Sequence, residues 1–325
     1  MTDNIRSFMN RMDVDHRDRL EGLPAYFMDL RDIGAARQAL AKFVDEATAN
    51  APDVGGMVAD YQVTASEGHR LLVRIYSPDQ LRTPAPALYW MHGGGMVRGD
   101  VRMSDITCQT MARDVGCVVA SVEYRLAPEN PHPTPIEDCY IGLMWLTERA
   151  PELGLDANRI AIGGTSAGGG MAASLALLCR DRGKLNIAFQ LLLSPMLDDR
   201  NQTFSSHYAV HSKVWNRSAN LIGWNALLEG AAGTDGVSQY AAAARATDLT
   251  ALPQAYISVG ELDLFLDESI AYATRLLQAG VPTELHVYPG AFHGSDTLVP
   301  GSDLSNRQVM DRNYALRTAL HPRLA

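Results

Sequence analysis

The chain has 325 residues, 46% hydrophobic and 20% charged, a balance typical of a globular protein with a sizeable core. A net charge of −9 without a basic run argues against nucleic acid or an anionic membrane as a partner. The four cysteines form no C-x-x-C pair, which favours buried thiols in a reducing compartment, so we expect a cytoplasmic protein. Residues 1–19 lack the apolar core of a signal peptide, and no apolar run in the sequence is long enough to span a bilayer.

The first region of the chain has the apolar spacing of helices. Ile33, Ala36, Leu40, Phe43 and Val44 recur at helical intervals, which predicts one or two N-terminal helices. Residues 50–56 contain glycine and proline and mark the end of this region.

Strand signals then follow in regular succession. Eight strands are predicted, at 57–64, 70–76, 87–91, 117–122, 159–162, 187–193, 254–259 and 284–288. A hairpin-length link joins the first two, and the later strands alternate with predicted helices at 105–114, 136–149, 171–182 and 267–279. This order predicts a mostly parallel sheet with helices on both faces. The alternation breaks between 198 and 250, so we expect an insertion that packs with the N-terminal helices over the carboxyl edge of the sheet.

A glycine-flanked serine lies between the fifth predicted strand and the helix after it. Ser166 is the centre of a G-x-S-x-G sequence with Gly164 and Gly168, the pattern of a nucleophile elbow. Glycines at these positions let the strand turn sharply into the helix without a side-chain collision. A flexible loop or a phosphate-binding loop is the alternative, but the Gly-Lys-Ser/Thr ending of a P-loop is absent.

A second glycine-rich segment follows the third predicted strand. His92 precedes Gly93, Gly94 and Gly95, the H-G-G-G sequence of an oxyanion hole. Consecutive glycines allow backbone N–H groups to approach a substrate oxygen. We expect the amides of Gly94 and Ala167 to bind the oxyanion, with Gly93 or Gly95 as a third donor, and His92 to hold the loop.

A serine nucleophile needs a base and an acid. In proteins with a nucleophile elbow, the acid and then the histidine base follow the serine along the chain. His293 lies in a glycine-bracketed turn after the eighth strand and is the predicted base. Asp263, after the seventh strand, is the first candidate for the acid, ahead of Glu261 and then Asp198. These loops follow the carboxyl ends of strands, where open α/β sheets place their sites. We expect neither a metal nor a cofactor.

Together these motifs resemble those of the bacterial hormone-sensitive-lipase-like (family IV) carboxylesterases. The resemblance rests on H-G-G-G, on Y-R-L-A-P-E at 124–129, on the elbow, on D-x-x-x-D-E at 263–268 and on residues 289–294. It implies an α/β-hydrolase fold with an eight-stranded, mostly parallel sheet and a helical cap, and it supports Asp263 as the acid. Residues 1–55 and 199–250 would form the cap, and 56–198 with 251–325 the catalytic domain. Thr165 and Glu123 stand where the family commonly has aspartate. With Thr165, the elbow sequence resembles that of a G-T-S-A-G subgroup of the family.

The expected substrate is a small-molecule ester with a short- to medium-chain acyl group. A cap would close an apolar pocket walled by Tyr26, Phe27, Trp215 and Trp224. The sequence leaves the oligomeric state open, with a homodimer as one option.

Other functions share part of this pattern. A lactonase, a thioesterase or an amidase on the same fold would use the same catalytic residues. A non-catalytic small-molecule receptor is a further alternative, because plant gibberellin receptors resemble this family. Those receptors have lost the catalytic histidine, whereas His293 is present here.

Overall fold

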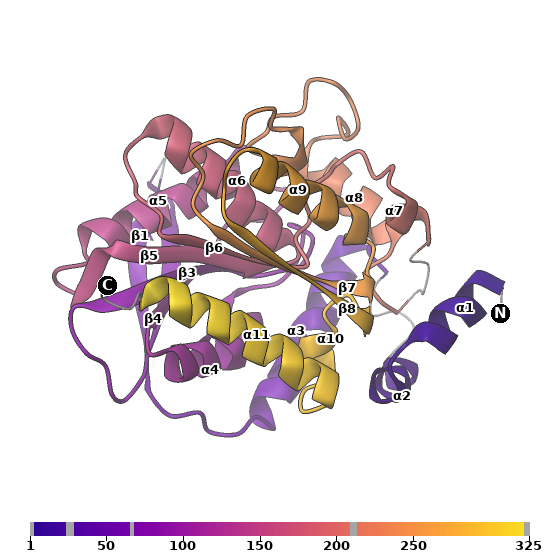
Figure 1. Ribbon diagram of the computed structural model, residues 1–325, viewed down its shortest axis with the longest axis horizontal. Coiled ribbons are helices and arrows are strands. Elements are labelled where there is room, and N and C mark those ends of the chain that lie inside the picture. Colours follow the sequence, from indigo (N-terminus) through magenta and orange to yellow (C-terminus); the bar gives the residue numbers. More distant parts are fainter. Residues whose placement is uncertain (1–2, 24–28, 66–67, 209–212, 322–325) are drawn as a thin grey trace.

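The computed structural model describes residues 3–23, 29–65, 68–208 and 213–321. Their strands form one eight-stranded sheet in the order β1-β2-β4-β3-β5-β6-β7-β8 (Figure 1). The strands are β1 Met57–Thr64, β2 Arg70–Ser77, β3 Ala85–Met91, β4 Val118–Val122, β5 Leu155–Thr165, β6 Phe189–Leu193, β7 Ala255–Leu262 and β8 Thr283–Phe292. β2 pairs antiparallel with β1 and β4, and every other pairing is parallel. The predicted mostly parallel sheet is confirmed.

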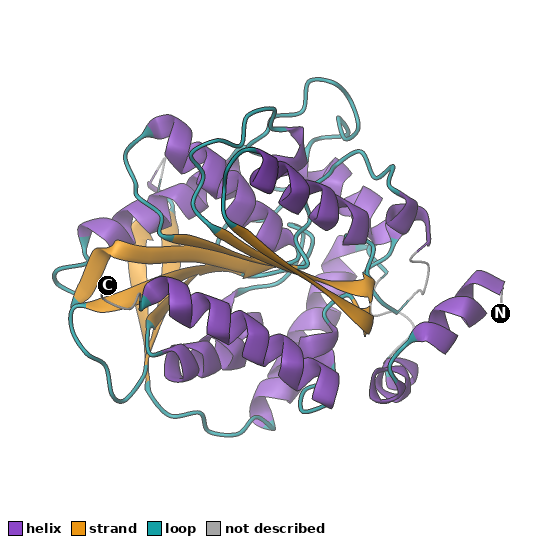
Figure 2. Ribbon diagram, in the orientation of Figure 1, coloured by secondary structure: helices purple, strands orange, loops and turns teal. Residues whose placement is uncertain are grey.

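Helices cover both faces of this sheet (Figure 2). The α-helices are α1 Asp3–Arg11, α2 Val14–Gly22, α3 Ile33–Ala49, α4 Asp105–Val115, α5 Thr134–Glu148, α6 Ala167–Arg182, α7 Phe204–Tyr208, α8 Arg217–Leu227, α9 Leu266–Gln278, α10 Ser295–Leu298 and α11 Asp303–Leu320. α4 and α11 lie on one face, and α5, α6 and α9 lie on the other. None of the described helices combines the length and apolar character needed to cross a bilayer.

The alternation of β3 side chains divides the core between these two faces. Tyr89 and Met91 belong to the cluster that contains α5 and α6, while Leu88 and Trp90 belong to the cluster of α4 and α11. All seven residues of β3 are buried, as expected for a central strand of a sheet covered on both faces. The central strands therefore form a rigid base for the loops at their carboxyl ends.

Among the strands that extend further than the sequence indicates, three end next to a predicted catalytic residue. β5 ends at Thr165, β7 at Leu262 and β8 at Phe292. The pairing of β7 with β8 shifts register between Gly260 and Leu262, so pairing continues past the Pro-Gly sequence that appeared to end the last strand.

The N-terminal region contains three described helices, not the one or two predicted. α2 is rich in charged residues and leaves little periodic signal, whereas Ile5, Phe8, Met9 and Met12 recur at helical spacing in and just after α1, a pattern that the sequence prediction did not use. Phe8 and Leu20 are nonetheless buried, in a cluster with Leu262 and Phe292 at the ends of β7 and β8. His16 of α2 is also buried, with Nε2 3.0 Å from Ser302 Oγ. This packing places the N-terminal helices at the carboxyl edge of the sheet (Figure 1).

Candidate active site

The elbow serine occupies a strained turn between β5 and α6. Ser166 has φ +60° and ψ −121°, a conformation rare for residues with a side chain. A Cβ at Gly164 would lie 2.4 Å from the backbone of Gly168, and one at Gly168 would lie 2.0 Å from the carbonyl oxygen of Met91. Glycine is therefore required at both flanking positions. The Ser166 N–H donates to the carbonyl of Leu193 on β6 at 2.8 Å, which ties the turn to the sheet.

The structure brings the three predicted catalytic residues into hydrogen-bonding contact. His293 Nε2 lies 2.9 Å from Ser166 Oγ, and His293 Nδ1 lies 2.8 Å from Asp263 Oδ2. The side chains are nearly inaccessible, since Ser166, Asp263 and His293 are 5%, 1% and 8% exposed. Asp263 Oδ1 accepts the Phe265 N–H at 3.0 Å, and the Phe265 ring meets the imidazole edge-on at 5.1 Å. The loop between β7 and α9 thus holds both the carboxylate and the imidazole in place.

The other acid candidates have different partners. Glu261 accepts the Gly290 N–H at 3.0 Å and forms an ion pair with Arg11. Asp198 forms an ion pair with Arg200 at 2.7 Å. Neither carboxylate is the partner of His293, so the geometry favours Asp263 over both.

The H-G-G-G segment passes directly beside the nucleophile. A Cβ at Gly93 would lie 3.4 Å from Ser166 Cβ. Gly94 and Gly95 have φ of +117° and +66°, and a Cβ on either would collide, with the carbonyl of Arg98 at 1.9 Å or the Trp215 ring at 2.1 Å. Ala167 is the first residue of α6, where N–H groups lack partners within the helix. Gly93 and Ala167 therefore lie on two sides of Ser166, and Gly94 lines the same cavity, whereas Gly95 packs against Trp215 and is not among the described lining residues.

His92 fixes the start of this segment. Its ring is buried and stacks on Tyr124 with centroids 4.3 Å apart, and the Tyr124 hydroxyl donates to the His92 carbonyl at 2.8 Å. Burial lowers the pKa of His92 to about 4, so the ring is neutral at pH 7. The Nδ1–H then donates to the Gly93 carbonyl at 2.7 Å. Tyr124 begins the Y-R-L-A-P-E sequence, which gives that motif a structural role.

Comparison with known proteins shows which family this chain is similar to. A family described as alpha/beta hydrolase fold matches residues 88–296. Esterase LipI of Mycobacterium tuberculosis is 35% identical over 263 residues, which cover 75% of each chain. Carboxylesterase NlhH of the same species is 36% identical over 227 residues, 68% of this chain and 70% of that protein. A solved bacterial heroin esterase has a TM-score of 0.92 and 40% identity, covering 96% of this chain and 99% of its own.

The chain belongs to the α/β-hydrolase family. Esterase LipW from Mycobacterium marinum, another solved structure, has a TM-score of 0.87 and 36% identity over 97% of this chain and 98% of its own. The predicted fold, and the resemblance to hormone-sensitive-lipase-like carboxylesterases, are confirmed by these relatives.

A cavity of about 160 Å³ opens onto the triad of this hydrolase. Its walls come from α3, from the segment after β3, and from the loops that carry Trp215 and His293. The described lining residues are Leu40, Phe43, Val44, Trp90, Gly93, Gly94, Arg98, Met103, Ser104, Thr107, Thr165, Ser166, Trp215, His293, Gly294, Thr297 and Leu298. Most of the lining is apolar, which suits the acyl and alcohol groups of an ester.

The predicted pocket residues have different outcomes. Trp215 lines the cavity, and its Nε1–H donates to Asn220 Oδ1 at 3.0 Å. Trp224 is fully buried in the core and is not among the described residues that line this cavity, so the structure gives no support for a role of Trp224 in the pocket wall. Tyr26 and Phe27 lie outside the described residues. Trp90 and Met103 were not predicted, since one reads as a core strand residue and the other follows no motif.

The two departures from the common family pattern lie in different settings. Thr165 lines the cavity beside Ser166. Glu123 instead accepts the Val101 N–H at 2.7 Å, so it fixes the far end of the segment that begins at His92. Burial, together with the nearby Asp100 charge, raises the pKa of Glu123 to about 7.

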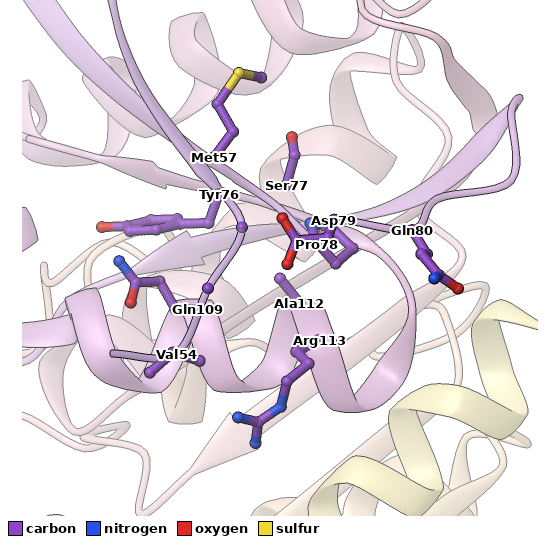
Figure 3. Close-up of a pocket in the computed structure, with 12 residues that line it drawn as sticks. Val54, Met57, Tyr76, Ser77, Pro78, Asp79, Gln80, Gln109, Ala112 and Arg113 are labelled. Atoms are coloured by element: carbon purple, nitrogen blue, oxygen red, sulfur yellow. The ribbon is translucent and has the colours of Figure 1, made fainter. Parts of the chain in front are cut away.

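A second cavity, of about 300 Å³, lies near the end of β2, beside α4 (Figure 3). Tyr76, Asp79, Gln109 and Arg113 are among its lining residues, none of which belongs to the triad. No cluster of metal-ligating side chains occurs within the described part of the chain. The four cysteines are free and buried, and burial raises the pKa of the Cys117 thiol to about 12, so that thiol is a poor nucleophile.

Proposed function

We propose that this hydrolase cleaves carboxylic esters with short to medium acyl chains through an acyl-enzyme on Ser166. The hydrogen-bonded series Asp263–His293–Ser166 at the wall of an apolar cavity carries this proposal. The names of its relatives, which include a carboxylesterase and an esterase, support the same reaction class.

The first half of the reaction forms the acyl-enzyme. Asp263 accepts the Nδ1–H of His293, which leaves a lone pair on Nε2 directed at the Ser166 hydroxyl. Ser166 Oγ attacks the ester carbonyl while Nε2 takes its proton. The carbonyl oxygen becomes an oxyanion that accepts hydrogen bonds from the amides of Gly94 and Ala167, with Gly93 or Gly95 as a third donor. The tetrahedral intermediate then expels the alcohol, which takes the proton from Nε2.

The second half releases the acid. Water enters the space left by the alcohol and gives a proton to His293 Nε2 as it attacks the acyl carbon. The second tetrahedral intermediate occupies the same oxyanion hole. Its collapse breaks the bond to Ser166 Oγ, which recovers its proton from His293, and a carboxylic acid leaves.

We also propose that residues 1–55 and 199–250 form a cap over the site. Leu40, Phe43 and Val44 of the first segment and Trp215 of the second line the cavity, which supports this division. The remaining segments, 56–198 and 251–325, would form the catalytic domain. The cytoplasmic location and the homodimer stay predictions.

The size of the cavity supports a limit on the substrate. Its volume of about 160 Å³ is smaller than the roughly 300 Å³ at which pockets for drug-sized ligands begin. Each methylene buried in the cavity favours binding by about 0.8 kcal/mol until the space is full. Turnover should therefore peak at short acyl chains and fall sharply on long-chain triglyceride.

Hydrolysis of p-nitrophenyl acetate by the full chain tests the proposal. We expect turnover that is lost on treatment with a serine-directed organophosphate and lost in folded Ser166→Ala. A folded Ser166→Ala protein with wild-type turnover would show that the nucleophile is another group. Wild-type protein that binds the ester without cleaving it would favour the receptor alternative.

A further inference from the structure

The oxyanion segment contains three successive residues with left-handed backbone. Gly94, Gly95 and Met96 have φ of +117°, +66° and +65°. Met96 is the exception among them, since a residue with a side chain is disfavoured in this conformation. Such a turn persists only where its surroundings hold it. The contacts around it therefore decide where its amides lie.

A side chain from α3 makes two of these contacts. Arg37 Nε donates to the Val97 carbonyl at 2.7 Å, and Arg37 Nη2 donates to the Ala127 carbonyl at 2.9 Å. The Ala127 N–H in turn donates to the Met96 carbonyl at 3.0 Å. We call residues 94–97 the oxyanion turn. The guanidinium of Arg37 thus joins α3 both to the oxyanion turn and to the 124–129 segment.

The guanidinium also contacts a carboxylate. Glu129 accepts from Arg37 Nη1 at 2.8 Å and from Nη2 at 2.7 Å. Glu129 is 58% exposed, so the ion pair by itself stabilises little. The hydrogen bonds to carbonyls matter more, because Val97 and Ala127 are both fully buried and a lost donor would leave their oxygens without this partner.

α3 also contacts the residues that follow the oxyanion turn, through an ion pair between exposed side chains. Asp45 of α3 forms an ion pair with Arg102 at 2.7 Å, and the two side chains are 63% and 42% exposed. No carbonyl of the oxyanion turn takes part in that ion pair. It therefore provides a comparison in which α3 and the segment lose a contact but the turn keeps its hydrogen bonds.

We propose that Arg37 is a positioning residue for the oxyanion hole, acting through its hydrogen bonds to the carbonyls of Val97 and Ala127. Leu40 and Val44, three and seven residues further along α3, line the substrate cavity. The same face of one helix therefore contacts the substrate and holds the turn that stabilises the transition state. This inference rests on the proposed acyl-enzyme mechanism.

The test compares four variants of the full chain. Arg37→Met removes all donors at similar length, and Arg37→Lys keeps the charge but cannot bridge two carbonyls. Glu129→Gln removes the ion pair and leaves the carbonyl contacts, and Asp45→Asn is the control on α3. For each, kcat and KM for p-nitrophenyl acetate are measured per active site titrated with an organophosphate. The Ki of a trifluoromethyl ketone, which forms a tetrahedral oxyanion adduct, is measured in parallel.

We expect Arg37→Met to lower kcat by roughly tenfold to a hundredfold with less than a threefold change in KM, below the 10²–10³ loss for a deleted donor. The ketone should bind more weakly by a similar factor. Arg37→Lys should show a smaller loss of the same kind, and Glu129→Gln and Asp45→Asn should stay within about threefold of wild type.

Several results would overturn the proposal. An Arg37→Met protein that titrates fully and keeps wild-type kcat and Ki is one. Equal losses in Arg37→Met and Glu129→Gln would assign the effect to the ion pair. If Arg37→Met does not fold, unchanged kcat and Ki in folded Arg37→Lys would refute it. Failure of the organophosphate to inactivate wild-type protein would instead refute the acyl-enzyme mechanism itself.

Discussion

Replacing Glu123 by glutamine should stabilise the protein at alkaline pH and have little effect at acidic pH. The carboxyl group is largely buried, and burial raises its pKa from an ordinary value near 4.5 to about 7. Between these values the folded state holds a proton that the unfolded state releases. Stability from this group is therefore present below about pH 4.5 and is lost as pH rises through 7.

The size of the effect follows from the difference between the two pKa values. Linkage over this interval gives a loss of about 2 to 3 kcal/mol in the free energy of unfolding between pH 5 and pH 8. Glutamine has no charge to bury, and its side-chain oxygen can still accept the Val101 N–H that Glu123 now binds at 2.7 Å. Glu123→Gln should thus match wild type near pH 5 and exceed its stability by about 2 to 3 kcal/mol at pH 8.

Urea unfolding of both proteins at pH 5, 6, 7 and 8 measures this difference. Other titrating groups are common to both chains and cancel in the comparison. Glu129→Gln is the control, since its ion pair with Arg37 lowers the pKa of Glu129 to about 2 and its effect should hardly vary over this range. A stability difference for Glu123→Gln that stays constant from pH 5 to pH 8 would refute the reasoning.

Three further predictions concern the site. Asp263→Asn should lower kcat by about 10⁴ because it removes the acceptor that sets the His293 tautomer, whereas Glu261→Gln should lower it far less; the reverse ranking of kcat would transfer the acid role. Trp215→Ala should raise kcat/KM for p-nitrophenyl octanoate relative to the acetate by opening the cavity, whereas Trp224→Phe, a core change, should leave that ratio unchanged. Deleting residues 1–45 should abolish turnover and promote aggregation by exposing apolar surface, and a soluble truncation with full short-ester turnover would contradict the cap.

The sheet and the triad could be predicted because both leave local signals. Apolar runs mark the central strands, and the G-x-S-x-G sequence has steric reasons that the structure makes explicit at Gly164 and Gly168. The choice of Asp263 over Glu261 was harder. Both follow the predicted strand at 254–259, but in the structure Glu261 lies within β7, at the register shift between Gly260 and Leu262, while Asp263 comes directly after the strand and contacts His293. Local sequence does not encode such a shift.

The walls of the cavity could be predicted only in part. Trp215 and Trp224 belong to the same inserted segment and both are buried, yet Trp215 precedes α8, lies against Gly95 and lines the cavity, whereas Trp224 lies within α8 and is not among the described lining residues. Which of two aromatic residues reaches a site depends on how a helix docks. Arg37 gave no signal at all, because an arginine on an amphipathic helix reads as a solvent-facing residue.

Side chains from both the proposed catalytic domain and the proposed cap hold the oxyanion segment, residues 92–101. Its two ends, near 92 and 101, are held by Tyr124 and Glu123, which follow a central strand and belong to the proposed catalytic domain. Its middle is held by Arg37 from α3 and by the Trp215 ring packed on Gly95, both from the proposed cap. The ends would therefore stay in place if the cap moved away, but the left-handed turn between them would lose side chains that hold it. On this argument, displacement of the cap should reduce transition-state stabilisation as well as substrate binding, so kcat and KM should change together.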